Sequence, residues 1–285
     1  MKDGKRVVTT APLKCAEYRD DFSVSMKLES YPNRDSTVFQ ERFGMKDCHT
    51  FIRGTLRFAG FSSIISAFHD IGLTSDDKAP HSVKILRDLL EFRLQNTSFT
   101  SHPNQKFIEK ATSGMSSQDV GLMKKAFMKI DFSHLKQNEL KTHQAITSIV
   151  KTMKFLGFFE TNCTVKNDGS QSCLDILSQV MAVRLAMDDQ DRDLVFMRHI
   201  FHIMDPRTNE TWEHTSTMVA SGDSEASGGK TMMSKTVGIT CGIATRMVLE
   251  GKIREKGVLS PITREIYNPI LSELEKRGIR MVEES

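Results

Sequence analysis

The periodicity of apolar residues changes twice along this chain, and this change most constrains the fold. Near both ends, short runs such as residues 23–28 alternate apolar and polar side chains, which is typical of strands with one buried face. Through the middle, apolar residues recur at intervals of three and four, as they do in amphipathic helices. The sequence therefore predicts an α/β or α+β chain in which a helical insert interrupts a mixed β-sheet.

The same signals divide the chain into four segments. We expect residues 1–73 to form the first part of a sheet domain and residues 74–190 to form the helical insert. Residues 191–229 return to the sheet, and residues 230–285 add two helices and a last strand.

Local signals place the elements before and inside the insert. β-Branched or alternating residues predict strands at 6–10, 23–28 and 49–58. Helices are expected from Asp35 or Ser36, either of which could cap the first turn, to Phe43, and at 61–71, with Gly44 and Gly72 as their ends. Within the insert, helical spacing is clearest at residues 83–90, 146–156 and 174–183, and the polar stretches 96–104 and 160–171 are expected to be surface loops.

Turn residues organise the last third of the chain. Residues 205–209 have turn composition and predict a hairpin between strands at 193–204 and 211–220. A loop of small residues, 221–229, then precedes a helix at about 230–251. Pro261 begins a second helix that Gly278 ends, and a last strand is expected at 279–282.

The composition excludes several classes of protein. Of 285 residues, 39% are hydrophobic and 26% charged, and no apolar run approaches the ~20 residues of a membrane span, so we expect a globular chain without a membrane partner. The net charge is 39 − 36 = +3 with both signs mixed throughout, which gives no reason to expect nucleic acid as a partner.

Five cysteines without a C-x-x-C pair argue against a disulfide framework and a zinc site, and we expect no bound metal. Residues 1–7 carry Asp3 and no apolar core, so we expect no targeting segment there.

The loop from Gly222 to Thr231 has the composition of a phosphate-binding turn but not its spacing. A P-loop requires a glycine five positions before its Gly-Lys pair, where this chain has Ser224. None of the seventeen glycines has another glycine two positions away, so the Gly-x-Gly-x-x-Gly turn that binds dinucleotides is also missing. We expect no cofactor-binding residues in this chain.

The common catalytic arrangements are equally absent from the sequence. His199 and His202 are three residues apart on a predicted strand, so they point to opposite faces and form no metal pair. No serine lies in a Gly-x-Ser-x-Gly turn, and no carboxylate pair stands out. The pattern therefore names no catalytic residue.

A cluster of arginines is the remaining candidate site. Along a strand Arg53, Thr55 and Arg57 share one face, and Arg34 follows Pro32 in the preceding turn. Arginine binds carboxylates well because its planar fork donates two parallel hydrogen bonds. The alternative that spacing alone leaves open is a solvated strand face with surface ion pairs.

Three separated motifs resemble saccharopine dehydrogenase. They are Tyr31-Pro32-Asn33-Arg34-Asp35-Ser36, then Arg53-Gly54-Thr55-Leu56-Arg57-Phe58, and later Met233-Ser234-Lys235-Thr236-Val237-Gly238. Residues 260–282 are similar to the end of the dehydrogenase part of the bifunctional α-aminoadipic semialdehyde synthase. The resemblance covers nearly the whole chain and is looser in the helical insert.

The resemblance implies an oxidoreductase of lysine degradation. Such an enzyme oxidises saccharopine with NAD or NADP: hydride leaves the carbon of a secondary amine, water adds to the imine, and glutamate and aminoadipate semialdehyde separate. It also implies that Arg34 grips a substrate carboxylate, with Thr55 continuing the pocket and Arg53 and Arg57 beside it. A homodimer and a location in the mitochondrial matrix, or otherwise in the cytoplasm, are further implications.

The chain departs from the family pattern before Tyr31. The family has an N-terminal Rossmann domain there, whereas only thirty residues precede Tyr31. We therefore expect this chain to be the substrate-binding C-terminal domain and to lack turnover when isolated. A non-catalytic binding or oligomerisation module derived from the enzyme, and a fragment of a longer parent chain, are the alternatives.

The predicted helix at 230–251 fits that expectation. Its apolar residues lie on more than one side, and they are Met232, Met233, Val237, Ile243, Met247 and Val248. We expect part of this surface, with the face formed by Ile262, Ile266, Ile270 and Leu274, either to meet a nucleotide-binding domain or to pack on the local sheet.

Overall fold

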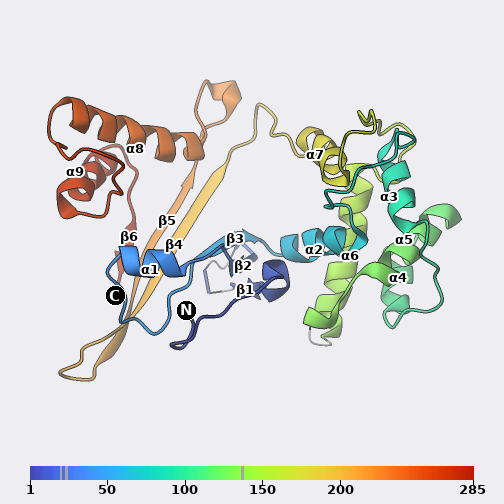
Figure 1. Ribbon diagram of the computed structural model, residues 1–285, viewed down its shortest axis with the longest axis horizontal. Coiled ribbons are helices and arrows are strands. Elements are labelled where there is room, and N and C mark those ends of the chain that lie inside the picture. The colour runs from blue at the N-terminus through green and yellow to red at the C-terminus, as the bar shows by residue number, and fades with distance from the viewer. Residues whose placement is uncertain (20, 23–24, 136–137) are drawn as a thin grey trace. The chain divides into compact units, whose positions relative to one another are not determined.

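The strands pair into two antiparallel sheets, each of three strands, within the part of the chain that the computed structural model describes, residues 1–19, 21–22, 25–135 and 138–285. The chain divides into two compact units, the first made of residues 1–40 and 46–186 and the second of residues 41–45 and 187–285. Figure 1 shows one sheet and most of the helices in the first unit, and the second sheet with two helices in the second. The expected α/β class is confirmed. In place of the one mixed sheet that the sequence predicted, the described residues form two antiparallel sheets, because the strands after the helical insert pair with one another.

The first sheet has the order β1 (Glu17–Tyr18), β2 (Leu28–Pro32), β3 (Gly54–Phe58). Its central strand β2 pairs with β3 so that Glu29 lies opposite Arg57 and Tyr31 opposite Thr55. Between these strands lies α1 (Thr37–Arg42), which Gly44 follows with a φ of +69°, as predicted. Asp35 caps α1, because its Oδ1 accepts a hydrogen bond of 2.9 Å from the Thr37 amide.

Of the three strands predicted in this region, one is absent and two begin later than expected. Residues 6–10 form no strand, and the short 3₁₀ helix η1 (Pro12–Cys15) follows them; Val7 and Val8 are 64% and 75% exposed, so no partner sheet buries their alternating side chains. The strand expected at 23–28 begins only at Leu28, while residues 23 and 24 lie outside the described residues. Residues 49–53 precede β3 rather than belonging to it, because His49 and Phe51 pair with the chain's first residues instead.

Helix α2 (Phe61–Ile71) follows β3 directly and has the predicted limits. Gly60 and Gly72 flank it with φ of +102° and +91°, a region that glycine enters without the steric penalty of a Cβ. The Gly72 amide donates to the carbonyls of Phe68 and His69, which closes the C-terminal turn.

Among its described residues, the helical insert contains five α-helices and the short 3₁₀ helix η2 (Ser133–Leu135), and the α-helices enclose the largest apolar core. These helices are α3 (Leu86–Leu94), α4 (Gln105–Ala111), α5 (Ser117–Lys129), α6 (Glu139–Leu156) and α7 (Cys173–Arg184). Helix α6 packs against α2, α4 and α7, and Phe68, Phe127 and Phe158 are fully buried in the core that results. Side chains of Ser116, Asn138 and Ser172 cap α5, α6 and α7. The stretches 96–104 and 160–171 contain no helix, as predicted.

An ion-pair cluster fastens η1 to the helical insert. The Lys14 ammonium lies 3.2 Å from Asp70 and 3.0 Å from Asp131. The amide of Asp131 also donates to Asp70, which joins the end of α5 to α2. Hydrogen bonds from Ser133, assisted by Lys14, hold the pKa of Asp131 well below its usual range, so this carboxylate stays charged in acid.

The second unit is built on a long hairpin, as predicted. Strands β4 (Leu194–Met204) and β5 (Thr211–Ser221) pair along their whole length, and β6 (Val282–Glu284) adds to β5 three residues after the predicted strand begins. The connection from β5 passes through the short 3₁₀ helix η3 (Glu225–Ser227) to α8 (Met232–Leu249), and α9 (Arg264–Glu275) follows.

Helix α8 presents apolar residues on two neighbouring sides. Met232 packs with Val195 and Met218 of the sheet. Ile243 and Met247 instead pack against the α9 residues Ile266, Ile270 and Leu274, which are therefore buried. Met233, Val237 and Val248 stay 58%, 63% and 55% exposed. One side of α8 thus packs locally, on the sheet near its start and on α9 further along, and the neighbouring side stays exposed.

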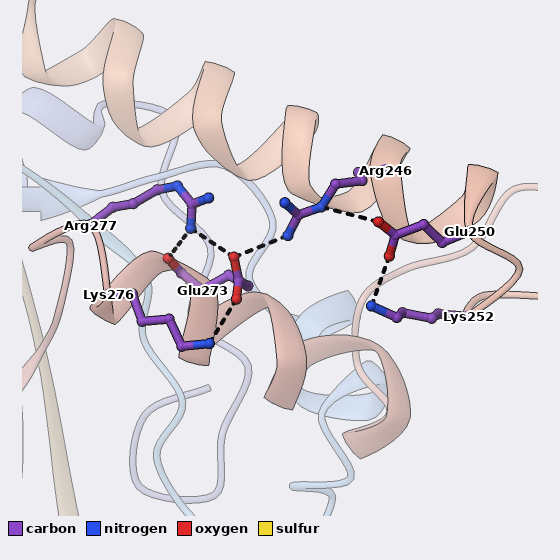
Figure 2. Close-up of polar contacts among 6 residues, drawn as sticks. All are labelled: Arg246, Glu250, Lys252, Glu273, Lys276 and Arg277. Carbon is purple, nitrogen blue, oxygen red and sulfur yellow. Dashed lines mark hydrogen bonds and ion pairs between the residues drawn. The ribbon is translucent and has the colours of Figure 1, made fainter.

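A single carboxylate, Glu273, ties α9 to α8 (Figure 2). It lies 3.0 Å from Arg246 of α8, and 2.8 Å from both Lys276 and Arg277. Lys276, with Arg277 and Arg246, lowers the pKa of Glu273 to about 2. Because the folded pKa is below the ordinary 4.5, the stabilisation is present above about pH 4.5 and is lost as the pH falls through the folded value.

The turn between β5 and α8 is held by Asp193, which precedes β4. Its carboxylate accepts hydrogen bonds of 2.7 and 2.8 Å from the amides of Met232 and Met233 at the start of α8. Gly222 lies against this contact, and a Cβ there would overlap the Asp193 carboxylate and come within 2.8 Å of the Thr231 Cα. Glycine is therefore required at 222 by packing.

We predict that Glu273→Gln lowers the melting temperature of the second unit at neutral pH, because a neutral amide cannot form ion pairs with Arg246, Lys276 and Arg277. The difference from the wild-type chain should shrink between pH 4.5 and 2, where wild-type Glu273 becomes protonated. Fluorescence of Trp212, the single tryptophan and a residue of β5, reports the melting of this unit. Glu275→Gln on the exposed side of α9 is the matched control, and an equal effect of both variants would contradict the prediction.

We predict that Gly222→Ala destabilises the second unit by about 1–3 kcal/mol, because the new methyl group meets backbone atoms that cannot move cheaply. Gly238→Ala in the middle of α8 should have the opposite sign and stabilise by about 0.5–1 kcal/mol, since nothing lies within 4 Å of its Cβ position. Urea denaturation of both variants measures the two changes. A neutral Gly222→Ala would show that the Asp193 contact does not hold this turn.

Candidate anion-binding site

The paired strands β2 and β3 bring the central residues of two of the motifs onto one sheet face. Residues opposite each other in an antiparallel pair share a face, as do residues two apart along a strand. Glu29 and Tyr31 of β2 therefore share a face with Thr55 and Arg57 of β3. This face, defined by these four residues, is called the Arg57 face below.

An aromatic ring from α2 supports the Arg57 side chain. The guanidinium carbon of Arg57 lies 5.3 Å from the centroid of the Phe61 ring, within the range of a cation–π contact. The Phe61 ring is stacked on Tyr31, with an interplanar angle of 7° and centroids 6.3 Å apart. Arg57 itself is exposed, and its Nη1 donates to the adjacent Leu56 carbonyl at 2.9 Å. The guanidinium group is thus held from beneath while it remains open to solvent.

Arg53 is supported in a similar way by α1. Its guanidinium carbon lies 3.8 Å from the centroid of the Phe39 ring. Its backbone carbonyl accepts a hydrogen bond of 2.9 Å from the Asn33 amide, which extends the β2–β3 register by one residue beyond Pro32 and Gly54. The Arg53 amide donates to the Ser36 hydroxyl at 3.3 Å.

Arg34 lies in the turn directly after this extension. Its φ of +51° is in the left-handed region, which is uncommon for a residue with a Cβ, and its side chain is exposed. Strained backbone conformations of this kind are often retained at binding sites. The next residue, Asp35, pairs with Arg6 at 3.1 Å and accepts from Thr37, so the turn is fixed on its far side.

The structure places the four predicted residues along the β2–β3 pair in two groups, near opposite ends of β3. Thr55 and Arg57 lie on the Arg57 face, whereas Arg34 and Arg53 are joined through Asn33 at the end of the strands. No ion pair within the described residues involves Arg34, Arg53 or Arg57, and their charges are available for an anion. Exposed guanidinium forks beside a hydroxyl suit a ligand with more than one carboxylate.

Sequence reasoning missed the groups that support these arginines. Phe39 and Phe61 belong to the helices that follow each motif, and Glu29 lies two residues before Tyr31. The period of two along β2 would have placed Glu29 and Tyr31 on one face. Nothing local indicates that Phe61 reaches under Arg57.

The glycine-rich loop of the second unit is not arranged for phosphate. The amides of Met232 and Met233, which a phosphate would need at the start of α8, already donate to Asp193. Lys235 forms an ion pair with Asp223 of the same loop. This agrees with the sequence argument that the loop lacks the P-loop spacing.

Other chemistry finds little support among the described residues. His199 and His202 are opposite Ser216 and Glu213, and thus on opposite faces of β4, as predicted. No group of three or more His, Cys, Asp or Glu in the described ranges could hold a metal ion. None of the described helices is long and apolar enough to cross a membrane.

Comparisons with known proteins identify the family. The model of the saccharopine dehydrogenase C-terminal domain matches residues 1–279. The saccharopine dehydrogenase (NADP(+), L-glutamate-forming) of Pyricularia oryzae is 30% identical over 285 residues, which are 99% of this chain and 57% of that protein. The mitochondrial alpha-aminoadipic semialdehyde synthase of Bos taurus is 30% identical over 265 residues, 93% of this chain and 25% of that protein.

A solved structure agrees with the sequence relatives. Apo saccharopine dehydrogenase (L-Glu forming) from Saccharomyces cerevisiae superposes with a TM-score of 0.79 at 28% identity, over 99% of this chain and 57% of the yeast chain. The chain thus spans little more than half the length of the fungal relatives, and about a quarter of the animal synthase. By sequence and by fold, this chain belongs to the saccharopine dehydrogenase C-terminal domain family.

Proposed function

We propose that this chain is the saccharopine-binding part of a NAD- or NADP-dependent saccharopine dehydrogenase of lysine degradation. The observation that carries the proposal is the placement of Arg34, Thr55 and Arg57 along the β2–β3 pair, with no acidic partner for either arginine among the described residues. Saccharopine is a tricarboxylate, so it offers several groups that guanidinium forks and a hydroxyl can bind.

The proposed role of these residues is to hold and orient the substrate. Arg34 and Arg57 bind carboxylates, Thr55 donates a hydrogen bond between them, and Arg53 adds positive charge at the strand end. Fixing a substrate at several points positions the carbon that loses hydride, which lowers the entropic part of the barrier. The nicotinamide, when bound, accepts the hydride, and the fungal relatives are named for NADP(+).

We propose that the cofactor is bound by a nucleotide-binding domain outside these 285 residues. The relatives are longer than this chain, and the start of α8 is occupied by Asp193 rather than open to phosphate. The exposed side of α8 supports a packing role for residues 230–285, because Met233 and Val237 lie there one turn apart and are 58% and 63% exposed.

The assembly and compartment of the parent enzyme are part of the same proposal. Met197, Ile203 and Trp212 share one face of the β4–β5 hairpin and are 43%, 36% and 45% exposed, which supports a homodimer formed through this sheet. Animal relatives are named mitochondrial, which supports a mitochondrial location. The second candidate function is a non-catalytic binding or oligomerisation module, favoured by the same exposed sheet face.

We predict that the chain binds saccharopine in a calorimetric titration and that Arg34→Ala weakens the binding at least about tenfold, because a charged hydrogen bond to carboxylate is lost. Arg207→Ala, which removes an exposed arginine from the turn of the hairpin in the second unit, should leave the affinity unchanged. Absence of saccharopine binding to the folded wild-type chain would favour the non-catalytic module.

We predict that the purified chain does not reduce NAD or NADP in the presence of saccharopine, and that it does so once joined to the nucleotide-binding domain of a relative. In the joined enzyme, Val237→Asp should lower activity by placing a charge on the exposed apolar side of α8, without changing the saccharopine affinity of the chain alone. Val183→Asp at an exposed site of α7 is the control. Saccharopine-dependent reduction by the chain alone would contradict the prediction.

A further inference from the structure

We propose that Glu29 is a positioning residue that sets the place of Arg57 by clamping Phe61. The inference rests on the proposed function for its consequence in binding, but its geometric part concerns only residues of this chain. Glu29 touches no substrate in this account, because its carboxylate is turned toward the start of α2 and its side chain is buried, with 3% of the residue exposed.

The clamp grips the chain on both sides of Phe61. The Glu29 carboxylate accepts a hydrogen bond of 3.0 Å from the Gly60 amide and one of 2.6 Å from the Ser62 amide. These are N–H groups at the start of α2 that have no partner within the helix. The positive end of the helix dipole adds to the attraction for the carboxylate. Phe61 lies between the two donors, so its backbone is fixed relative to β2.

Fixing the Phe61 backbone fixes the surface on which Arg57 rests. The Phe61 ring lies parallel to Tyr31 on one side of the contact, and the Arg57 guanidinium carbon is 5.3 Å from its centroid. A guanidinium group that rests on a ring keeps the N–H groups at its edge free for a planar carboxylate. Glu29, Tyr31 and Phe61 thus act on the orientation of Arg57 and not on its charge.

Glu29 and Arg57 lie opposite each other on β2 and β3, yet their charges do not form an ion pair in the described structure. The two residues are direct partners in the β2–β3 register and share a face, where opposite charges commonly form an ion pair. Here both carboxylate oxygens bind amides of α2, and no described ion pair joins them to Arg57. Glu29 therefore fixes Phe61, on which Arg57 rests, without neutralising the Arg57 guanidinium that would bind substrate.

Nuclear magnetic resonance tests the geometric part without any ligand. The Arg57 Nε–Hε resonance, assigned by its loss in Arg57→Lys, should carry a ring-current shift from Phe61. Phe61→Leu should abolish that shift, and Glu29→Gln should reduce it, because the amide offers only one acceptor for two donors. A resonance that moves in Phe61→Leu and not in Glu29→Gln would overturn the proposal.

A double-mutant cycle tests the functional part. Glu29→Gln should weaken saccharopine binding by about tenfold in the wild-type chain and by less than about twofold in the Arg57→Ala chain, because the effect passes through Arg57. An equal loss in both backgrounds would show that Glu29 only stabilises the fold. Should Glu29→Gln fail to fold, Glu29→Asp, which is one methylene too short to reach both amides, replaces it in both experiments.

The matched control is Asp193→Asn, which removes the same kind of contact in the other compact unit. Asp193 also accepts two hydrogen bonds from amides at a helix start, so its loss should destabilise the chain comparably. It should leave both the Arg57 resonance and the saccharopine affinity unchanged. If the wild-type chain binds no saccharopine, the proposed function fails, while the resonance experiment still decides whether Glu29 positions Arg57.

Discussion

The start of an α-helix leaves several amides without partners, and in each compact unit one of these starts is satisfied by a carboxylate from a distant part of the chain. Glu29 of β2 accepts from Gly60 and Ser62 at the start of α2. Asp193, just before β4, accepts from Met232 and Met233 at the start of α8. Each carboxylate links the strand part of its unit to the start of a helix more than thirty residues away in sequence. It thereby fixes the position of that helix relative to the strands.

The contacts of Glu29 and Asp193 with helix amides also restrict where an anionic ligand can bind. A helix start is a ready site for phosphate or carboxylate, but here the protein's own acids occupy the starts of α2 and α8. These two helix starts therefore offer no free amides to an anion, and the candidate site relies on side-chain cations. The arginines of the two motifs are suited to this, because Phe39 and Phe61 support two of them by ring faces. Elsewhere arginines such as Arg87, Arg184 and Arg246 form ion pairs with acids and are neutralised.

The elements that sequence reasoning predicted correctly are those specified by nearby residues. Helix α2 has a glycine at each end, and the β4–β5 hairpin has a turn of five suitable residues between alternating strands. The strand expected at residues 6–10 failed because β-branched residues form a strand only where a partner accepts them, and Val7 and Val8 have none. The arginines could be named from their motif, yet their supports could not, since the contact of Arg57 with Phe61 depends on the angle at which α2 leaves β3. Glu29 was missed because an acid in an alternating strand is normally assigned to solvent, and only the fold shows that two amides meet it.

Along β2 and β3, the acids beside Arg34 and Arg57 have other partners, and this explains how both arginines stay available for the candidate site. A strand pair that places Glu29 opposite Arg57 would ordinarily lose both charges to one ion pair. Because the helix amides bind the carboxylate from one direction and the ring holds the guanidinium from another, the two charges are kept apart at adjacent positions. The turn at Arg34 follows the same rule, since Asp35 is occupied by Arg6 and Thr37 and leaves Arg34 without an acidic partner in the described chain. An anion that binds along β2 and β3 therefore meets guanidinium groups whose neighbouring acids already have partners, so binding adds contacts instead of exchanging one carboxylate for another.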